Sequence, residues 1–475
     1  MDRDYDLILV GTGFASSFFL SAYLDRCRAD ERILVLERGH RDSHAWQLQH
    51  RQPASTDHRS TFVNRHRRKQ WFYTPALGGG SNCWWAVTPR FMPNDFALHS
   101  TYGVGVDWPL TYDGLEPFYG RAEDLMAVSG PADGSPQPRS TPYPQPPHRF
   151  SQPDELLKKA YPELFFHQPT ARARQATAHR PACCASGVCH LCPIDAKFTV
   201  LNEMGHLYTD PRVTLVLGAT VQHVETSGGT ARGVGYRKGG AEIQARGQLV
   251  ALGANALFNP HILLRSGLDH PLLGKALHEQ VSVTATIDLD GVDNFSGSTS
   301  ITGHGYMLYD GPHRAQRAGC LIETWNVPSL RLERGKWRQR LVLKFMFEDL
   351  PDPRNHVRLY PDDPTRPETV YRNHSGYAQR GIDALADILP DLLRPLPVEN
   401  VDLNPLPTAT ENHILGTVPM GGDPQRSIVD RHLIHHQVRN LLVLGGSAFP
   451  TSSPANPTLT LSALSLWAAD HLFGS

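Results

Sequence analysis

Ile8-Leu-Val-Gly11-Thr-Gly13-Phe-Ala-Ser16 is the stretch of sequence that decides the fold of this chain. It joins a short apolar run to a helical pattern that begins at Phe14. Gly11 permits a tight turn, and Gly13 allows the backbone to approach a pyrophosphate at the helix N-terminus. Ser16 stands at the third glycine position and is small enough for helix and strand to pack closely. The stretch therefore predicts a dinucleotide-binding strand, turn and helix.

A second strand, predicted within residues 32–36, is followed by an acidic side chain. This is Glu37, whose carboxylate can accept hydrogen bonds from the hydroxyls of an adenosine ribose. An acid here argues against a phosphate on that ribose, but it does not choose between FAD and NAD. A strand followed by a helix, as in the Rossmann-type unit, is predicted again late in the chain. Residues 440–444 predict the strand, and residues 459–472 predict an apolar helix.

The segments between these ends have patterns of their own. Residues 131–155 are dense in proline and predict an extended connector, because proline blocks helix and removes a hydrogen-bond donor. The β-rich runs at 213–216 and 248–252 predict a small sheet that returns to the first domain. Residues 376–393 predict one amphipathic helix.

Composition narrows the class of protein. The chain has 475 residues, 40% hydrophobic and 20% charged, which suits a globular protein of two domains. Its formal net charge of −1 gives no reason to expect nucleic acid or an anionic membrane as a partner. No apolar run is long enough to span a bilayer. The one basic run, residues 65–69, is expected to be a solvated loop.

The N-terminal residues lead directly into the first predicted strand. They lack the charged region, apolar region and cleavage site of a secretory signal. The expected location is therefore the cytoplasm.

A second glycine-rich turn reads Leu77-Gly-Gly-Gly-Ser81-Asn-Cys83-Trp-Trp85. Three glycines allow backbone amides to approach a ligand, and the tryptophan pair offers aromatic surface beside it. Taken alone, the turn fits equally well a tight connection next to core tryptophans.

Together the two turns resemble the FAD contacts of the glucose–methanol–choline (GMC) oxidoreductases. Residues 107–125 are similar to a stretch typical of the branch with pyranose oxidases and bacterial sugar dehydrogenases. The segments 413–421 and 449–460 resemble the C-terminal signature of the family, and Ser427-Ile-Val-Asp430 continues the match. In the family, the residues that match His413 and Asn456 form a pair facing the flavin N5.

The resemblance implies oxidation of an alcohol group, on a sugar or glycoside, with electrons passed to an external acceptor. A neutral imidazole at His413 suits the base that removes the hydroxyl proton, since its ordinary pKa is about 6.5. Asn456 can donate a hydrogen bond to the substrate oxygen. An FAD-only oxidase that uses O2 is the alternative. An NAD-dependent enzyme or a non-catalytic nucleotide-binding protein would leave His413, Asn456 and the second turn unexplained.

The resemblance also implies the fold, an α/β chain in which a Rossmann-type FAD-binding domain is intertwined with an α+β substrate domain built on an antiparallel sheet. Residues 1–95, 175–275 and 405–475 are expected to form the FAD-binding domain. Residues 96–174 and 276–404 are expected to form the substrate domain, including the connector at 131–155. The residues expected to contact the cofactor are Gly11, Gly13, Ser16, Glu37, Gly79, Gly80, Ser81, Asn82, Cys83, Val221, Gly446 and Pro457.

Cys83 stands where members of this branch often have a histidine, which in some of them is bonded to the flavin. A histidyl bond is therefore ruled out at this position. A cysteinyl bond is an alternative, but we expect noncovalent FAD.

Four of the seven cysteines lie in one short segment, at positions 183, 184, 189 and 192. Clustered thiolates followed by proline indicate metal or iron–sulfur ligation. Sugar dehydrogenases of the branch hold a three-iron cluster in a similar segment, which implies Cys183, Cys189 and Cys192 as ligands, although the second spacing is one residue shorter here. Zinc, a disulfide or free thiols are the alternatives. A cluster would imply a cytochrome or a small electron-transfer or export subunit as partner, and such a subunit could carry the chain to the periplasm.

Overall fold

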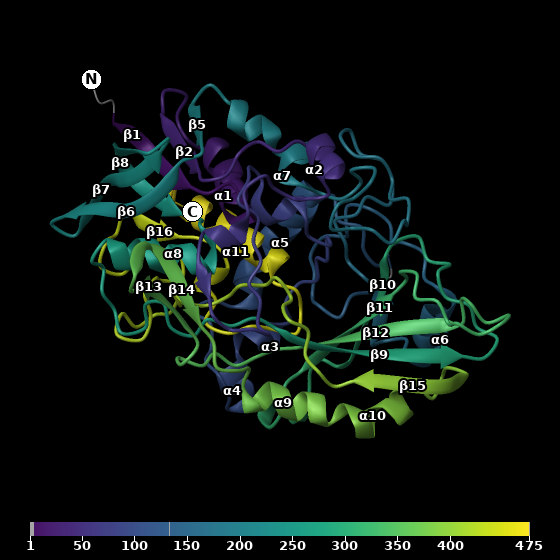
Figure 1. Ribbon diagram of the computed structural model, residues 1–475. Helices are drawn as coiled ribbons and strands as arrows, with labels where there is room; N and C mark the ends of the chain where they lie inside the picture. The colour runs from purple at the N-terminus through teal and green to yellow at the C-terminus, as the bar shows by residue number, and fades with distance from the viewer. Residues whose placement is uncertain (1–3, 133, 475) are drawn as a thin grey trace.

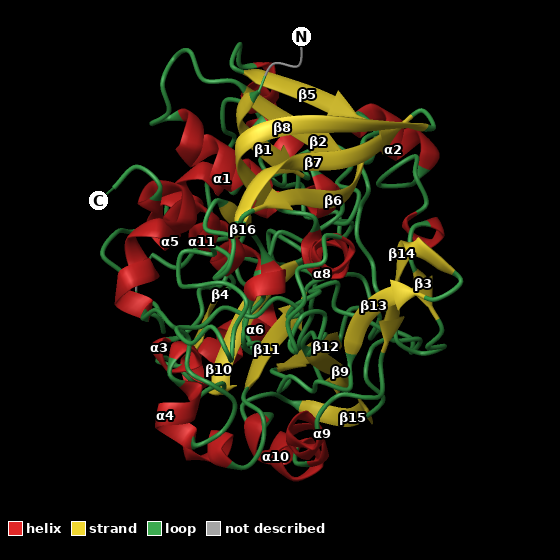
Figure 2. Ribbon diagram, turned by 90° about the vertical axis from the view of Figure 1, so that its left-hand side faces the viewer, coloured by secondary structure: helices red, strands yellow, loops and turns green. Residues whose placement is uncertain are grey.

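The computed structural model describes residues 4–132 and 134–474. The first three residues, on which the expectation of no export signal partly depends, and one residue of the proline-rich connector lie outside this description. Among the described residues, no helix is both long enough and apolar enough to cross a lipid bilayer. Figures 1 and 2 show two sheets at opposite ends of the molecule, with helices and long loops between them.

The first sheet grows from the opening motif. Its strands run in the order β5, β2, β1, β8, β7, β6, and β16 also pairs with β8. The central pairings among β5, β2, β1, β8 and β16 are parallel, whereas β6, β7 and the first half of β8 form an antiparallel meander. The apolar runs bury both faces of the central strands, as a parallel sheet requires. The bounds are β1 (Tyr5–Val10), β2 (Ile33–Glu37), β5 (Val213–Leu217), β6 (Thr220–Ser227), β7 (Thr230–Lys238), β8 (Ala241–Leu252) and β16 (Leu441–Val443).

This arrangement corrects one prediction. The runs at 213–216 and 248–252 do not form a separate small sheet, because β5 pairs with β2 and the second half of β8 pairs with β1. The apolar character of both runs is explained by their place inside the main sheet.

Helices from both ends of the chain cover this sheet. α1 (Phe14–Leu24) packs against α11 (Thr458–His471), and α11 packs in turn against α5 (Tyr112–Met126). In Figure 1 the yellow C-terminal helix lies beside the purple N-terminal helix. α8 (Asn255–Arg265) begins directly after β8 and contacts β6 and β13.

The second sheet is antiparallel throughout, in the order β15, β9, β12, β11, β10, β4. A hydrophobic core lies against this sheet. It includes Val283 and Phe345 from the strands and Ile382 and Leu389 from two helices that pack on them. Figure 1 shows these helices along one edge of the molecule. The bounds are β4 (Phe165–His167), β9 (Val281–Leu289), β10 (Ile301–Leu308), β11 (Cys320–Trp325), β12 (Arg340–Phe347), β15 (Val398–Asn404), α9 (Gly376–Asp383) and α10 (Leu385–Leu392).

The amphipathic helix predicted at 376–393 is thus two short helices that meet at Ala384, which caps both of them. The apolar face is nonetheless continuous, since residues of α9 and α10 share one core.

The remaining elements are short. A third sheet, β13 (His356–Tyr360), β14 (Asp363–Val370) and β3 (Val63–Asn64), connects an early loop to the later part of the chain. The other helices are α2 (His44–His50), α3 (Pro93–Phe96), α4 (Leu98–Tyr102), α6 (Gln152–Ala160), α7 (Val200–Glu203) and the 3-10 turns η1 (His58–Ser60), η2 (Gly79–Asn82), η3 (Gly205–Thr209), η4 (Pro312–Ala315) and η5 (Gly446–Ala448). The expected fold class, a Rossmann-type unit combined with an antiparallel second domain, is confirmed. The exact domain boundaries stay a prediction.

Candidate functional site

A cavity of about 570 Å³ lies between the carboxyl ends of the parallel strands and the second sheet. Ligand sites occur at this edge of parallel sheets, because the loops that follow the strands meet there. The residues expected to contact a cofactor or substrate that line this cavity are Gly11, Gly13, Glu37, Gly79, Gly80, Cys83, Val221, His413, Gly446, Asn456 and Pro457.

The two glycine turns meet at the floor of this cavity. Gly79 has a φ of +55°, and a Cβ placed on it would lie 2.8 Å from the Cα of Gly13. Only glycine allows this contact. Gly13 is the N-cap of α1, and no side chain caps the helix there. Because a Cβ on Gly13 would meet nothing within 4 Å, the N-terminus of α1 opens into free space.

Glu37 is buried at the end of β2. Its Oε2 accepts a hydrogen bond from the hydroxyl of Thr12 at 2.8 Å, and its Oε1 accepts one from the N–H of Gly39 at 2.8 Å. Burial raises the pKa of this carboxyl, and the two hydrogen bonds oppose that effect. Each oxygen retains a lone pair for a ligand in the cavity.

Three of the expected cofactor residues lie outside the cavity lining. The hydroxyl of Ser16 donates to the carbonyl of Val10 at 3.2 Å, so Ser16 joins α1 to β1. The hydroxyl of Ser81 donates to the carbonyl of Gly78 at 2.6 Å, and the amide of Asn82 donates to the carbonyl of Leu77 at 3.0 Å. Their side chains support the turns from behind.

His413 lines the cavity with a half-buried side chain. Its Nδ1 lies 2.5 Å from Oε1 of Gln280. The Nε2 of Gln280 lies 2.9, 3.0 and 2.7 Å from the carbonyls of residues 453, 454 and 455. Since carbonyls only accept hydrogen bonds, the amide nitrogen must face them, and Oε1 must be the acceptor for His413.

The surroundings of His413 favour its neutral form. Burial lowers the pKa of this imidazole to about 4, with the carboxylate of Glu411 acting in the opposite direction. The backbone N–H of His413 donates to Oε2 of Glu279 at 3.1 Å, and Glu279 also pairs with Lys69. Lys69 is therefore buried in the support of the site, which corrects the expectation of a solvated loop for this one residue, whereas Arg65, Arg67 and Arg68 are exposed.

Asn456 is buried, and its Oδ1 has no hydrogen-bond partner among the described residues. It reaches the same cavity as His413 from the turn before α11.

A polar and aromatic wall from the second sheet completes the lining. Trp325 of β11 contacts Trp85 at 5.1 Å between ring centroids. Lys344 of β12 pairs with Glu411 at 2.5 Å. Burial raises the pKa of Glu411, but Lys344 and neighbouring hydroxyls bring it below its ordinary value. The site therefore holds a base candidate next to a fixed charge pair and an aromatic surface.

The cysteine segment, residues 183–192, forms no helix or strand. All seven cysteines are free thiols, and no group of three or more His, Cys, Asp or Glu side chains within residues 4–132 and 134–474 could hold a metal ion. The structure therefore does not support iron–sulfur ligation by Cys183, Cys189 and Cys192, nor zinc or a disulfide.

The sulfurs instead contact protein groups. Cys183 lies 3.7 Å from the hydroxyl of Thr299, Cys189 lies 2.9 Å from that of Ser300, and Cys192 accepts the N–H of Ala196 at 3.3 Å. Lys197 follows this segment, and its buried ammonium donates to the carbonyls of Asn82, Trp84 and His190 at 2.9–3.0 Å. The cysteine loop and the second glycine turn are thus tied together.

Sequence reasoning missed Gln280, Glu279, Lys344, Glu411 and Trp325. None of them lies in a recognisable motif. Trp325 and Lys344 lie on strands β11 and β12, Glu279 and Gln280 directly precede β9, and Glu411 lies in the loop after β15. The one available signal was the closeness of Glu411 to His413 in sequence.

Two family models described as GMC oxidoreductase match the chain, the N-terminal model at residues 149–282 and the C-terminal model at residues 351–465. The chain is 27% identical to a fructose dehydrogenase large subunit of Gluconobacter japonicus, covering 83% of this chain and 80% of that one. It is also 27% identical to a 6'''-hydroxyparomomycin C oxidase of Streptomyces lividus, covering 98% and 90%.

Solved structures share the fold. The crystal structure of pyridoxine 4-oxidase from Mesorbium loti superimposes with a TM-score of 0.72 at 17% identity, covering 98% of this chain and 99% of that one. A formate oxidase superimposes with a TM-score of 0.68 at 15% identity, covering 99% and 98%.

Proposed function

Because the chain belongs to the GMC oxidoreductase family, we propose that it binds FAD and oxidises an alcohol group of a small molecule, with His413 as the base. The observation that carries this proposal is the contact between His413 and Gln280, which leaves the other ring nitrogen without a proton at the cavity.

The residues present fit FAD. The uncapped N-terminus of α1 and the space beside Gly13 offer amide donors and room for a pyrophosphate. Glu37 offers carboxylate oxygens at the end of β2, the position at which this type of fold binds the ribose of a dinucleotide. The second turn and the unpartnered Oδ1 of Asn456 lie further along the same cavity, where the flavin ring would be held. When bound, FAD supplies the two-electron acceptor for the alcohol carbon.

The side chains of the site then handle the proton. The free Nε2 of His413 takes the hydroxyl proton, which leaves an imidazolium whose Nδ1–H still donates to Gln280. The carboxylate of Glu411 favours the positive charge that forms. The Asn456 amide orients the substrate oxygen by a hydrogen bond.

A polyhydroxylated substrate, a sugar or glycoside, is part of the proposal. The cavity wall beside His413 holds Lys344, Glu411 and Glu323, which bond to protein groups and still offer further donor and acceptor positions for the hydroxyls of a substrate. The rings of Trp85 and Trp325 offer an aromatic surface for the apolar face of a sugar ring. Relatives named fructose dehydrogenase and gluconate 2-dehydrogenase are consistent with this class.

The acceptor separates two versions of this function. The first passes electrons to an external acceptor, such as a cytochrome or a small electron-transfer subunit. The second uses O2 directly as the acceptor.

A substrate screen tests the proposal. Purified protein that carries flavin is mixed anaerobically with sugars, glycosides and simple alcohols, and bleaching of the flavin absorbance is followed. We expect sugars to bleach it, and a flavin-loaded protein that no alcohol reduces but dithionite does would contradict the proposal. Two further assays then distinguish the acceptors. Turnover with an artificial dye indicates an external acceptor, and hydrogen peroxide formation in air indicates O2.

A further inference from the structure

We propose that Gln280 is a positioning residue that fixes the tautomer of His413 and couples it to the segment that carries Asn456. The inference rests on the proposed function for the role of His413 itself. It goes beyond that function by assigning a task to a residue that never touches the reacting atoms.

The orientation of the Gln280 amide is settled by its neighbours. Gln280 precedes β9 and is 1% exposed, so water does not compete for its polar atoms. Three carbonyls of the 453–455 segment surround its Nε2 at 2.7–3.0 Å. A flipped amide would place its oxygen against three other oxygens and leave its nitrogen without an acceptor.

The orientation of the amide fixes the proton on the imidazole. Oε1 of Gln280 lies 2.5 Å from Nδ1 of His413 and can only accept, so Nδ1 carries the hydrogen. A neutral imidazole has one N–H, and Nε2 therefore keeps its lone pair. This is the form that can take a proton from an alcohol.

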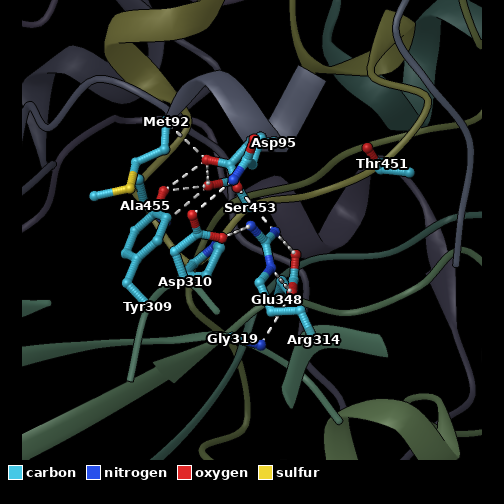
Figure 3. A network of polar contacts seen from close by, with 12 residues as sticks. Met92, Asp95, Tyr309, Asp310, Arg314, Gly319, Glu348, Thr451, Ser453 and Ala455 are labelled. Atoms are coloured by element: carbon cyan, nitrogen blue, oxygen red, sulfur yellow. Dashed lines mark hydrogen bonds and ion pairs between the residues drawn. The ribbon is translucent and has the colours of Figure 1, made fainter. Parts of the chain in front are cut away.

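The 453–455 segment is itself held by a buried polar network (Figure 3). The hydroxyl of Ser453 lies 2.8 Å from both Asp95 and Tyr309, and the N–H of Ala455 donates to it at 3.1 Å. Arg314 pairs with Asp95 at 2.9 Å and with Glu348 at 2.6 Å. The carbonyls that orient Gln280 are thus fixed from behind.

Adjacent residues hold the two parts of His413. Glu279 accepts the backbone N–H of His413, and Gln280 accepts the ring N–H. Asn456 directly follows the 453–455 segment. The same segment therefore positions both His413, through Gln280, and Asn456.

Two variants distinguish this role from a purely structural one, in which Gln280 only holds the 453–455 segment in place. Gln280→Met removes both the acceptor for His413 and the donor to the carbonyls. Gln280→Glu also loses the donor, but it keeps an acceptor for Nδ1–H and adds a negative charge, which raises the pKa of His413. We expect Gln280→Met to slow anaerobic flavin reduction at least about tenfold at every pH. We expect Gln280→Glu to recover much of the rate at alkaline pH, with the acid limb of its pH profile moved to higher pH.

If Gln280 has only the structural role and acts through the 453–455 segment, a different result is expected. Both variants lose the same donor, so Gln280→Glu would be at least as slow as Gln280→Met at every pH. That result would overturn the proposal.

A double-mutant cycle tests the path of the effect. If Gln280 acts through His413, the His413→Ala, Gln280→Met double variant reduces its flavin no more slowly than His413→Ala alone. Additive losses would contradict the assignment. Flavin absorbance and reduction by dithionite show that each variant is loaded.

A measurement without turnover keeps the proposal separate from the proposed function. Protein labelled with 15N-histidine gives ring-nitrogen shifts that distinguish the two tautomers, and the signal of His413 is the one lost in His413→Ala. We expect Nδ1–H in the wild-type protein and a shift toward Nε2–H in Gln280→Met. A wild-type ring protonated on Nε2 would refute the proposal, whereas a correct tautomer in a protein that oxidises no alcohol would refute only the proposed function.

Discussion

At the scale of single residues, the neutral imidazole of His413 is the feature on which the proposed chemistry depends. Burial lowers its pKa to about 4, and the Gln280 oxygen determines which nitrogen carries the hydrogen. A base must be both deprotonated and correctly oriented to act, and the site meets these two requirements through different neighbours.

Replacing His413 tests its role as the base. We expect His413→Ala to retain flavin but to slow anaerobic flavin reduction by at least about 10²-fold, the usual contribution of a positioned base. Asn456→Ala should cost less, because a hydrogen bond to an uncharged oxygen contributes about 0.5–1.5 kcal/mol. Stopped-flow spectrophotometry measures both rates, and a near-normal rate in His413→Ala would exclude the residue as the base.

The lowered pKa of His413 predicts a wide pH range of activity. The reactive form is the neutral one, so the rate is lost as pH falls through the pKa of the folded protein. Because burial places this pKa near 4 rather than at the ordinary value, flavin reduction should stay nearly constant from pH 8 down to about pH 5.5. The rate is measured anaerobically across this range, and an acid limb at pH 6.5 or above would contradict the assignment.

At the scale of elements, the contact between the two glycine turns builds the floor of the cavity. Gly79 approaches Gly13 so closely that a Cβ would lie 2.8 Å from its Cα. The turn after β1 and the turn that contains η2 are therefore one structural unit, although 66 residues separate Gly13 from Gly79.

Gly79→Ala tests this unit. The substitution should push the turns apart and reduce the flavin content of the purified protein by more than half. Gly103→Ala is the matched control, because Gly103 also has a positive φ, +74°, but a Cβ there meets nothing within 4 Å. The ratio of flavin absorbance to protein absorbance gives the content. Equal losses in both variants would mean that backbone strain, rather than the close contact, is responsible.

Local sequence predicts the first sheet better than the second. The strand–turn–helix that begins at Ile8 is formed by neighbours in sequence, so its pattern could be read directly. Gln280 and Lys69 reach the site only through pairings of distant segments, which no local pattern encodes. Residues 376–393 show the same limit, since the apolar face was predicted correctly but the division at Ala384 was not.

The cysteine segment marks a second limit of sequence reasoning. Cysteine spacing predicts that thiols can converge, but convergence itself is a tertiary property. In the structure the sulfurs of Cys183, Cys189 and Cys192 contact hydroxyl and amide groups of the protein. The spacing therefore did not predict the contacts that the thiols make in the folded chain.

At the scale of the whole molecule, the buried network of Figure 3 joins the second sheet to the C-terminal part of the chain. Arg314 follows β10, Glu348 follows β12, and Asp95 belongs to α3. Ser453, which bonds to Asp95, precedes the helix that packs on α1. Buried charged groups therefore connect the second sheet to the segment that precedes α11.

Arg314→Met tests how much this network contributes. Removing the cation leaves the buried carboxylates of Asp95 and Glu348 without the positive charge that pairs with both, which costs about 3–5 kcal/mol of unfolding free energy for a buried pair. The midpoint of urea unfolding should fall accordingly. Arg354→Met serves as control, because the side chain of Arg354, which pairs with Asp352, is 76% exposed, and solvent screening leaves such a pair little to lose. Similar midpoints for the two variants would show that the network does not hold the halves together.

The packing of α11 on α1 also has a consequence for how the protein is made. A ribosome releases β1 and the first glycine turn early, but the wall of the cavity that contains Gly446, Asn456 and Pro457 emerges only with the last tenth of the chain. Until β16 adds to β8, the cavity is open on that side. We therefore expect the FAD of the proposed function to be captured late in biosynthesis, so that a nascent chain arrested before residue 440 remains colourless.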